Sequence, residues 1–136
     1  MRHYKFRTFL ILTLLWLAIV LLQAFLPGDA SYAESNGVLA LAQVVFPWLT
    51  HSVLRHAAHV IEYFLLGFLL TGTFCYARRF TIFKPVFFSL LAAVCDESIK
   101  IFVIDRMAQL SDVWLDGAGA LAGILLMWLI SAIKKR

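Results

Sequence analysis

The chain has 136 residues, of which 62% are apolar and 15% are charged, and its formal net charge is +4. Average soluble domains are about 45–50% apolar, and a mean hydropathy of +0.88 leaves more apolar surface than a soluble chain of this length can bury. We therefore exclude a water-soluble domain. We also expect no nucleic-acid partner, because the basic residues are not gathered on a soluble platform.

Four apolar stretches approach the ~20 residues that cross a bilayer as a helix. They cover about residues 9–26, 57–76, 86–104 and 113–133. The first follows basic residues, as in a signal peptide, but its apolar run exceeds the usual ~7–15 residues, so we predict a retained helix. The predicted fold is a single all-α domain over residues 1–136, an integral membrane four-helix bundle.

The connection between the first two stretches contains a further apolar segment. Residues 37–48 are mostly apolar, include Pro47, and end at Trp48. About a dozen residues are too few to span a bilayer, and tryptophan is enriched at the membrane–water interface. We predict a short interfacial or re-entrant helix in this first outer loop.

The distribution of basic residues predicts the orientation. Nine of the 12 lysines and arginines fall at the two termini and in the second connection, whereas all eight acids lie on or toward the other side. The nine are Arg2, Lys5, Arg7, Arg78, Arg79, Lys84, Lys134, Lys135 and Arg136. Because cytoplasmic loops carry an excess of lysine and arginine, we predict a multi-pass plasma-membrane protein with both termini cytoplasmic.

Ionisable side chains within the predicted spans are the most informative feature. Glu62, Asp96, Glu97, Lys100 and Asp116 lie in or at the edges of these spans, together with His59. A charge at the bilayer centre costs ~2.5–3.5 kcal/mol even on a lenient scale, so such residues face a bundle interior or a wet cavity. All of them fall toward the predicted outer half of the membrane.

Helical spacing places these residues on three polar stripes. The second span carries Arg55, His59 and Glu62 on one face, the third carries Asp96 and Lys100 with Glu97 about 100° around the helix, and the fourth carries Asp112 and Asp116. We predict an outward-opening polar pocket between the three spans. Gly119 and Gly123 form a GxxxG step, which favours close helix packing.

Three segments resemble the VanZ-like (teicoplanin-resistance) membrane family. They are Arg55-His56-Ala57-Ala58-His59 with Glu62-Tyr63, then Asp96-Glu97-Ser98-Ile99-Lys100, and then Arg106 with Ser111-Asp112-Val113, Asp116, Gly119-Ala120 and Gly123. The match covers about residues 50–125. His56 stands where the family usually has lysine, and Lys100 where it usually has glutamine. The resemblance implies a cell-envelope protein and a link to teicoplanin, a lipid-tailed glycopeptide, but no defined reaction.

Several functions fit the predicted pocket, and the sequence does not decide whether the protein is an enzyme. The first is binding of an amphiphile or lipid headgroup, with membrane lipids, an envelope lipid or a lipid-tailed glycopeptide as partners. The second is a hydrolase or transferase acting on an envelope lipid, with His59 as general base, oriented by Glu62 or Asp96, and with Glu97 as general acid. A purely structural polar core also fits, with Arg55 and Arg106 paired with carboxylates, namely those of Glu62, Asp96, Glu97 and Asp112. A proton relay within an oligomer fits as well. We predict no cofactor and no metal, and we assign no oligomeric state.

The predicted pocket residues are Arg55, His59, Glu62, Tyr63, Asp96, Glu97, Lys100, Arg106, Asp112 and Asp116.

Overall fold

The computed structural model describes residues 2–77 and 80–134, and within these ranges it contains five helices and no strand. The helices are α1 (Arg2–Ala24), α2 (Gly28–Gln43), α3 (His51–Tyr76), α4 (Phe83–Lys100) and α5 (Leu110–Ile133). The all-α prediction is therefore confirmed. Of the residues used to predict the orientation, Arg78, Arg79, Lys135 and Arg136 lie outside the described residues.

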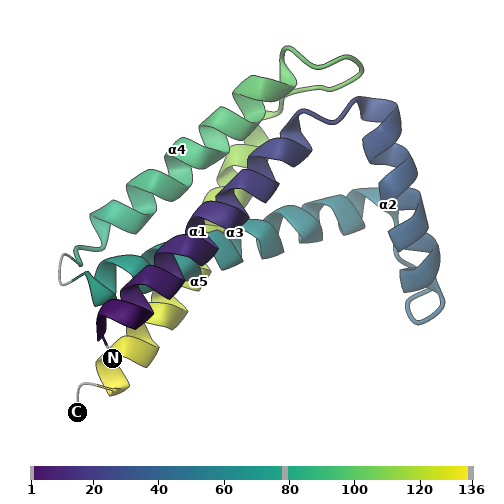
Figure 1. Cartoon of the computed structure of the whole chain (residues 1–136). Coiled ribbons are helices and arrows are strands. Elements are labelled where there is room, and N and C mark those ends of the chain that lie inside the picture. Colours follow the sequence, from purple (N-terminus) through teal and green to yellow (C-terminus); the bar gives the residue numbers. More distant parts are fainter. Residues whose placement is uncertain (1, 78–79, 135–136) are drawn as a thin grey trace.

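Three of the described helices are long and apolar enough to cross a membrane. These segments are His3–Ala24, His51–Tyr76 and Leu110–Ile133. Helix α4 does not belong to this set, because its 18 residues include Lys84, Asp96, Glu97 and Lys100. It nevertheless packs against α1, α3 and α5, and Figure 1 shows it running beside α1.

The start of α1 and the end of α5 lie at one end of the molecule. The end of α4 and the starts of α3 and α5 lie toward the opposite end (Figure 1). The charged residues of these three helices therefore come from segments that the fold brings to the same end. We call this the polar end, comprising the first three turns of α3, the last turns of α4 and the first two turns of α5.

Two predicted boundaries are wrong. The third predicted span extends to residue 104, but α4 ends at Lys100 and residues 101–109 form a loop in which Asp105 has a φ of 57°. The apolar segment predicted at residues 37–48 is helical only to Gln43, and α2 begins much earlier, at Gly28. Pro27 precedes this helix with φ −55°, and Asp29 in its first turn interacts favourably with the helix dipole. These two features start the helix early.

Helix α2 stands apart from the other helices in Figure 1, and its main contacts are with α3. Val44, Val45, Phe46 and Trp48 follow it in an exposed turn.

Helices α3 and α5 form the most extensive helix–helix contact, and glycines make it close. A Cβ atom added at Gly119 would lie 2.6 Å from the carbonyl oxygen of Val60, and one at Gly123 would overlap the carbonyl oxygen of Phe64. Gly67 of α3 makes the reciprocal approach to Ala120 of α5. Small residues at these positions let the two helix backbones meet closely.

The core lies beside this contact, whereas the outer faces of the helices are apolar and exposed. Tyr63, Leu66, Ala93 and Ala120 are buried in one cluster with Val20 of α1. Large apolar side chains remain exposed on α1, α4 and α5, among them Leu14, Leu15, Phe87, Leu91, Leu125 and Trp128. A soluble protein rarely exposes so much apolar surface, so this surface is suited to lipid.

Candidate functional site

The first turns of α3 supply one side of the site. Thr50 caps the helix, its hydroxyl accepting a hydrogen bond from the Val53 amide at 3.4 Å. Arg55, His59 and Glu62 follow on one face, where all three line a cavity. The backbone at Glu62 is fixed from α1, because the Trp16 indole Nε1 donates to the Glu62 carbonyl oxygen at 2.9 Å.

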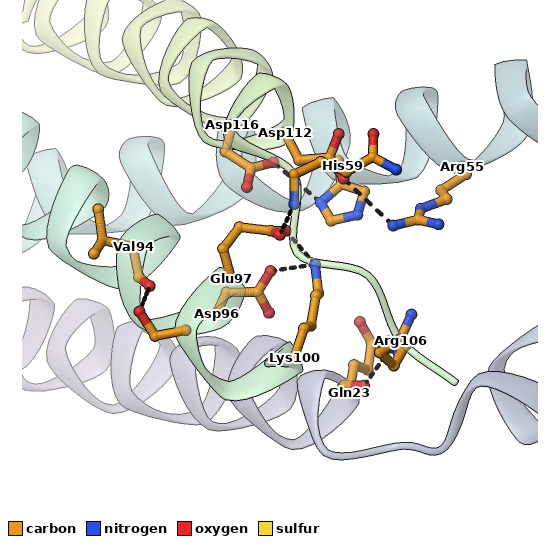
Figure 2. Close-up of polar contacts among 12 residues, drawn as sticks. Gln23, Arg55, His59, Val94, Asp96, Glu97, Lys100, Arg106, Asp112 and Asp116 are labelled. Atoms are coloured by element: carbon orange, nitrogen blue, oxygen red, sulfur yellow. Dashed lines mark hydrogen bonds and ion pairs between the residues drawn. The ribbon is translucent and has the colours of Figure 1, made fainter. Parts of the chain in front are cut away.

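Helix α5 supplies two buried carboxylates, one turn apart. Asp112 is 2% exposed and Asp116 is fully buried. Arg55 donates from Nη2 to Asp112 Oδ2 at 3.4 Å, and His59 Nδ1 lies 3.1 Å from Asp116 Oδ1. An ionised carboxylate only accepts hydrogen bonds, so Nδ1 carries the hydrogen, and in the neutral imidazole Nε2 is then an acceptor. The two pairs join α3 to α5 across the polar end (Figure 2).

The last turn of α4 buries a lysine between two carboxylates. Lys100 Nζ lies 2.7 Å from Asp96 Oδ2 and 2.5 Å from Glu97 Oε1. The other Glu97 oxygen, Oε2, accepts a hydrogen bond from the Gln109 amide at 2.8 Å, just before α5 begins. Glu97 therefore ties the loop of residues 101–109 to α4, and Asp96 faces α3 and α5 (Figure 2).

Arg106 in this loop closes the site against α1. Its Nε donates to the Leu26 carbonyl oxygen at 3.1 Å, and its Nη2 donates to the Gln23 carbonyl oxygen at 3.0 Å. The last carbonyl groups of a helix have no partner within the helix, and a cation suits that end of the helix dipole. Burial and the nearby charge of Arg55 lower the pKa of Arg106, although an arginine remains charged at neutral pH.

A cavity of about 650 Å³ opens between these groups. The acidic and basic residues of its lining are His51, Arg55, His56, His59, Glu62, Asp96, Lys100, Asp105, Arg106 and Asp112. Val20, Leu26, Leu54 and Met107 add apolar wall, and α2 contributes Tyr32 and Val38. Apolar walls with a few placed polar groups are typical of small-molecule sites of about 300–1,000 Å³.

Four buried side-chain oxygens of the described residues have no hydrogen-bond partner: Tyr63 Oη, Ser89 Oγ, Asp96 Oδ2 and Asp116 Oδ2. Asp96 Oδ2 nevertheless forms an ion pair with Lys100. Asp116 uses Oδ1 toward His59, but its Oδ2 is left without a partner. The hydroxyl of Tyr63 is likewise buried without one. Such groups are rare in folded proteins, because a buried polar atom without a partner costs about 1–3 kcal/mol. Of the predicted pocket residues, Tyr63, Glu97 and Asp116 do not line the cavity, and Tyr63 belongs to the buried core cluster.

His59, Asp96 and Asp116 together form a group suited to metal binding. One potential ligand atom from each lies within 4.8 Å of the others, and the three residues come from α3, α4 and α5. A ring nitrogen and two carboxylate oxygens are ligands of divalent transition metals. We predicted no metal from the sequence, because the three residues lie on three separate helices and no spacing along a single helix shows this arrangement.

Sequence reasoning also missed several partners. It expected Glu62 or Asp96 to orient His59, whereas the bonded partner is Asp116. It expected Arg106 to pair with carboxylates, whereas the two hydrogen bonds of Arg106 go to backbone carbonyl groups. Helix periodicity could not show either contact, because it defines faces and not how the faces of separate helices meet.

Comparison with known proteins gives a match that covers most of the chain. A family model described as VanZ/LLP1 matches residues 9–131, which include all five helices in whole or in large part. No curated protein and no solved structure matches the chain.

Proposed function

Because the chain belongs to the VanZ/LLP1 family, we propose that it is a VanZ-like membrane protein of the cell envelope that binds an amphiphile headgroup at its polar end. The observation that carries the proposal is the cavity of about 650 Å³, whose wall combines cations, carboxylates and apolar side chains. The cavity lies at the ends of helices that are apolar enough to cross a membrane. The cations and carboxylates suit a polar headgroup, and the apolar side chains suit the first part of the acyl chain attached to it.

The topology proposed for this function has four crossings. Helix α4 has 18 residues, which extend about 27 Å at 1.5 Å per residue, close to the ~30 Å of the hydrocarbon core. Phe87, Leu91 and Val94 are exposed on its outer face, where lipid would cover them. With both termini cytoplasmic, as the basic residues favour, the cavity opens to the outer leaflet of the plasma membrane.

The cavity lining favours a phosphate headgroup that also carries hydrogen-bond donors. The Arg55 side chain is 44% exposed and bonds to Asp112 through one nitrogen, which leaves donors for a phosphate. Glu62 lines the same cavity, and its carboxylate suits a hydroxyl, amide or ammonium group. Ethanolamine and glycerol phosphate headgroups both have this chemistry.

Lipid retention by the purified full-length chain tests the proposal. We would exchange the protein into phosphatidylcholine nanodiscs containing fluorescent phosphatidylethanolamine or phosphatidylglycerol and measure bound label. Arg55→Ala should weaken binding about tenfold or more, because hydrogen bonds to charged groups contribute about 1.5–3 kcal/mol. Arg7→Ala is the matched control, since Arg7 is an exposed arginine at the opposite end of the molecule. Equal binding of the labelled lipid by both variants would contradict headgroup binding and would mean that the polar end has a structural role only.

We extend the proposal to glycopeptide susceptibility, which the family resemblance implies. Occupation of the cavity by a lipid-tailed glycopeptide, or by an envelope lipid on which it acts, would alter the response to teicoplanin. Expression of the wild-type chain in a susceptible host should raise the inhibitory concentration of teicoplanin, whereas expression of Arg55→Ala to the same level should not. Equal inhibitory concentrations with the wild-type chain and with an empty vector would contradict this extension.

The contact between His59 and Asp116 favours hydrolysis or transfer as a second candidate function. The carboxylate orients the imidazole, and His59 lines the cavity, so Nε2 could take a proton from an attacking hydroxyl group. Glu97 is not suited to the acid role, because its two oxygens bind Lys100 and the Gln109 amide. Headgroup release from phosphatidylethanolamine by the wild type, and its loss in His59→Ala, would support this function. Absence of release by the wild type would contradict it.

A further inference from the structure

We propose that His59, Asp96 and Asp116 bind one divalent transition-metal ion, of the class that includes Zn²⁺ and Mn²⁺. The three residues converge from α3, α4 and α5, with one potential ligand atom of each within 4.8 Å of the others. Figure 2 shows the three side chains turned toward the same space. The inference stands on this cluster and does not require that a headgroup be bound.

The first independent observation is the carboxylate of Asp116. This side chain is fully buried, and its Oδ2 has no hydrogen-bond partner among the described residues. One oxygen is used by His59, so the second is free to bind a cation. A buried oxygen of this kind needs an explanation in a native structure, and an unseen ion is one of the recognised causes.

The second observation is the balance of buried charge. The buried Asp, Glu and Lys residues of the described chain are Asp96, Glu97, Lys100, Asp112 and Asp116. Arg55 balances Asp112, and Lys100 balances one of the remaining three carboxylates. With His59 neutral, two negative charges are then left without a counterion at buried positions, where uncompensated charge is costly. A divalent cation would neutralise both charges, and neutral His59 would supply its third ligand.

The donor set defines the class of ion. Calcium and magnesium prefer oxygen ligands, whereas imidazole together with carboxylates suits zinc, manganese and ferrous iron. Zinc binds these donors at about 2.0–2.2 Å, so ligand atoms around the ion lie about 3.3 Å apart. The ligand atoms, which lie within 4.8 Å of one another, would therefore move closer by at most about 1.5 Å upon binding. Three protein ligands leave a coordination position open, and His59 and Asp96 place it beside the cavity.

Substitution of Lys100 distinguishes a metal site from a purely structural ion pair. Its ammonium group contacts Asp96 at 2.7 Å, so it competes with a metal for this carboxylate. Glutamine is uncharged and similar in length. Lys100→Gln should therefore bind Zn²⁺ more tightly than the wild type does, by about tenfold or more, although it loses stability in the presence of a chelator.

The experiment uses the purified full-length chain in detergent micelles, stripped with a chelator and titrated with Zn²⁺ against a competing fluorescent indicator. We expect one Zn²⁺ per chain, with affinity at least tenfold lower in His59→Ala and in Asp116→Asn. Asp29→Asn, which changes an exposed carboxylate on α2, is the control and should bind as the wild type does. Circular dichroism checks that each variant retains its helices.

Cobalt spectroscopy keeps the proposal falsifiable if a variant does not fold. Wild-type protein loaded with Co²⁺ should show the visible absorption bands of a low-coordinate ion with nitrogen and oxygen ligands. The proposal is overturned if the wild type binds no Zn²⁺ and gives no such bands, in which case protons alone neutralise the carboxylates. It is also overturned if folded His59→Ala and Asp116→Asn bind Zn²⁺ as tightly as the wild type.

Discussion

Helices α3 and α5 meet in two different ways along their length. At the polar end they meet through side chains, with Arg55 against Asp112 and His59 against Asp116. Beyond Asp116 they meet through backbone, where Gly119 and Gly123 contact the carbonyl groups of Val60 and Phe64. The change from side-chain contact to backbone contact occurs within one turn of α5. A single pair of helices therefore carries both the charged pairs of the site and the glycine contact that holds the two helices together.

The two kinds of contact depend on each other. Charged side chains need accurate placement to offset the cost of removing them from water. Backbone contact at a glycine allows little sliding or rotation, because a small shift produces a clash. The glycine contact beyond Asp116 therefore fixes the register at which the charged pairs form. Substitutions in each region should separate the two contributions to stability and to function.

The largest expected effect is at the buried lysine of the polar end. Lys100→Met leaves Asp96 and Glu97 without their cation, and breaking a buried ion pair typically costs 3–5 kcal/mol. We expect the free energy of unfolding in detergent, measured without added metal, to fall by about that amount. Lys134→Met, at an exposed lysine after α5, is the control. A comparably small change in both variants would mean that the carboxylates do not need Lys100.

The next effect is at the glycine contact. Gly123→Ala places a methyl group against the Phe64 carbonyl oxygen, and overpacking of this kind costs typically 1–3 kcal/mol. We expect a loss of about 2 kcal/mol in the free energy of unfolding. Gly37→Ala is the matched control, because nothing lies within 4 Å of a Cβ at Gly37, and alanine favours a helix. Equal stability of the two variants would be incompatible with close α3–α5 packing.

Removal of Arg106 should have a smaller effect. Arg106→Ala loses the hydrogen bonds to the carbonyl oxygens of Gln23 and Leu26, and we expect a loss of about 1.5 kcal/mol. Hydrogen exchange at the amides of the 101–109 loop should accelerate, because the loop loses its attachment to α1. Arg106→Lys should give an intermediate loss. A lysine variant as unstable as the alanine variant would indicate that charge alone contributes nothing there.

The smallest effect is expected in the apolar half, where α1 meets α3. The hydroxyls of Thr13 and Thr73 are 3.0 Å apart and buried. Thr73→Val should lower the free energy of unfolding by about 1 kcal/mol, the usual net contribution of one hydrogen bond. Thr8→Val is the control, because Thr8 is exposed and bonds only to its own helix at Tyr4. Thermal unfolding in detergent would measure both variants.

The sequence was sufficient to predict which residues share a face. Glu62, Asp96 and Asp116 stand out because ionisable groups are rare in apolar helices, and their spacing groups them with Arg55, Lys100 and Asp112. The close packing at Gly119 and Gly123 follows a general pattern of membrane helices. These features depend on the spacing of residues along one helix, and this spacing can be read directly from the sequence.

The partners of these residues depend on tertiary geometry that periodicity does not contain. His59 bonds to Asp116 because of how α3 and α5 are rotated against each other. Arg106 reaches α1 because the 101–109 loop turns sharply, with Asp105 at positive φ. The start of α2 depended on Pro27 and Asp29, a local signal that the apolar pattern of residues 37–48 obscured.

Cross-linking tests most directly whether the charged faces of separate helices converge. In a chain with Cys75 and Cys95 replaced by serine, we would combine His59→Cys with Asp96→Cys, add Hg²⁺, and cleave at a protease site inserted between α3 and α4. The account predicts that the two fragments stay joined, whereas fragments of a His59→Cys and Ser98→Cys chain separate, because Ser98 is exposed. Separation of the fragments in both chains, or joining in both to the same extent, would contradict the account.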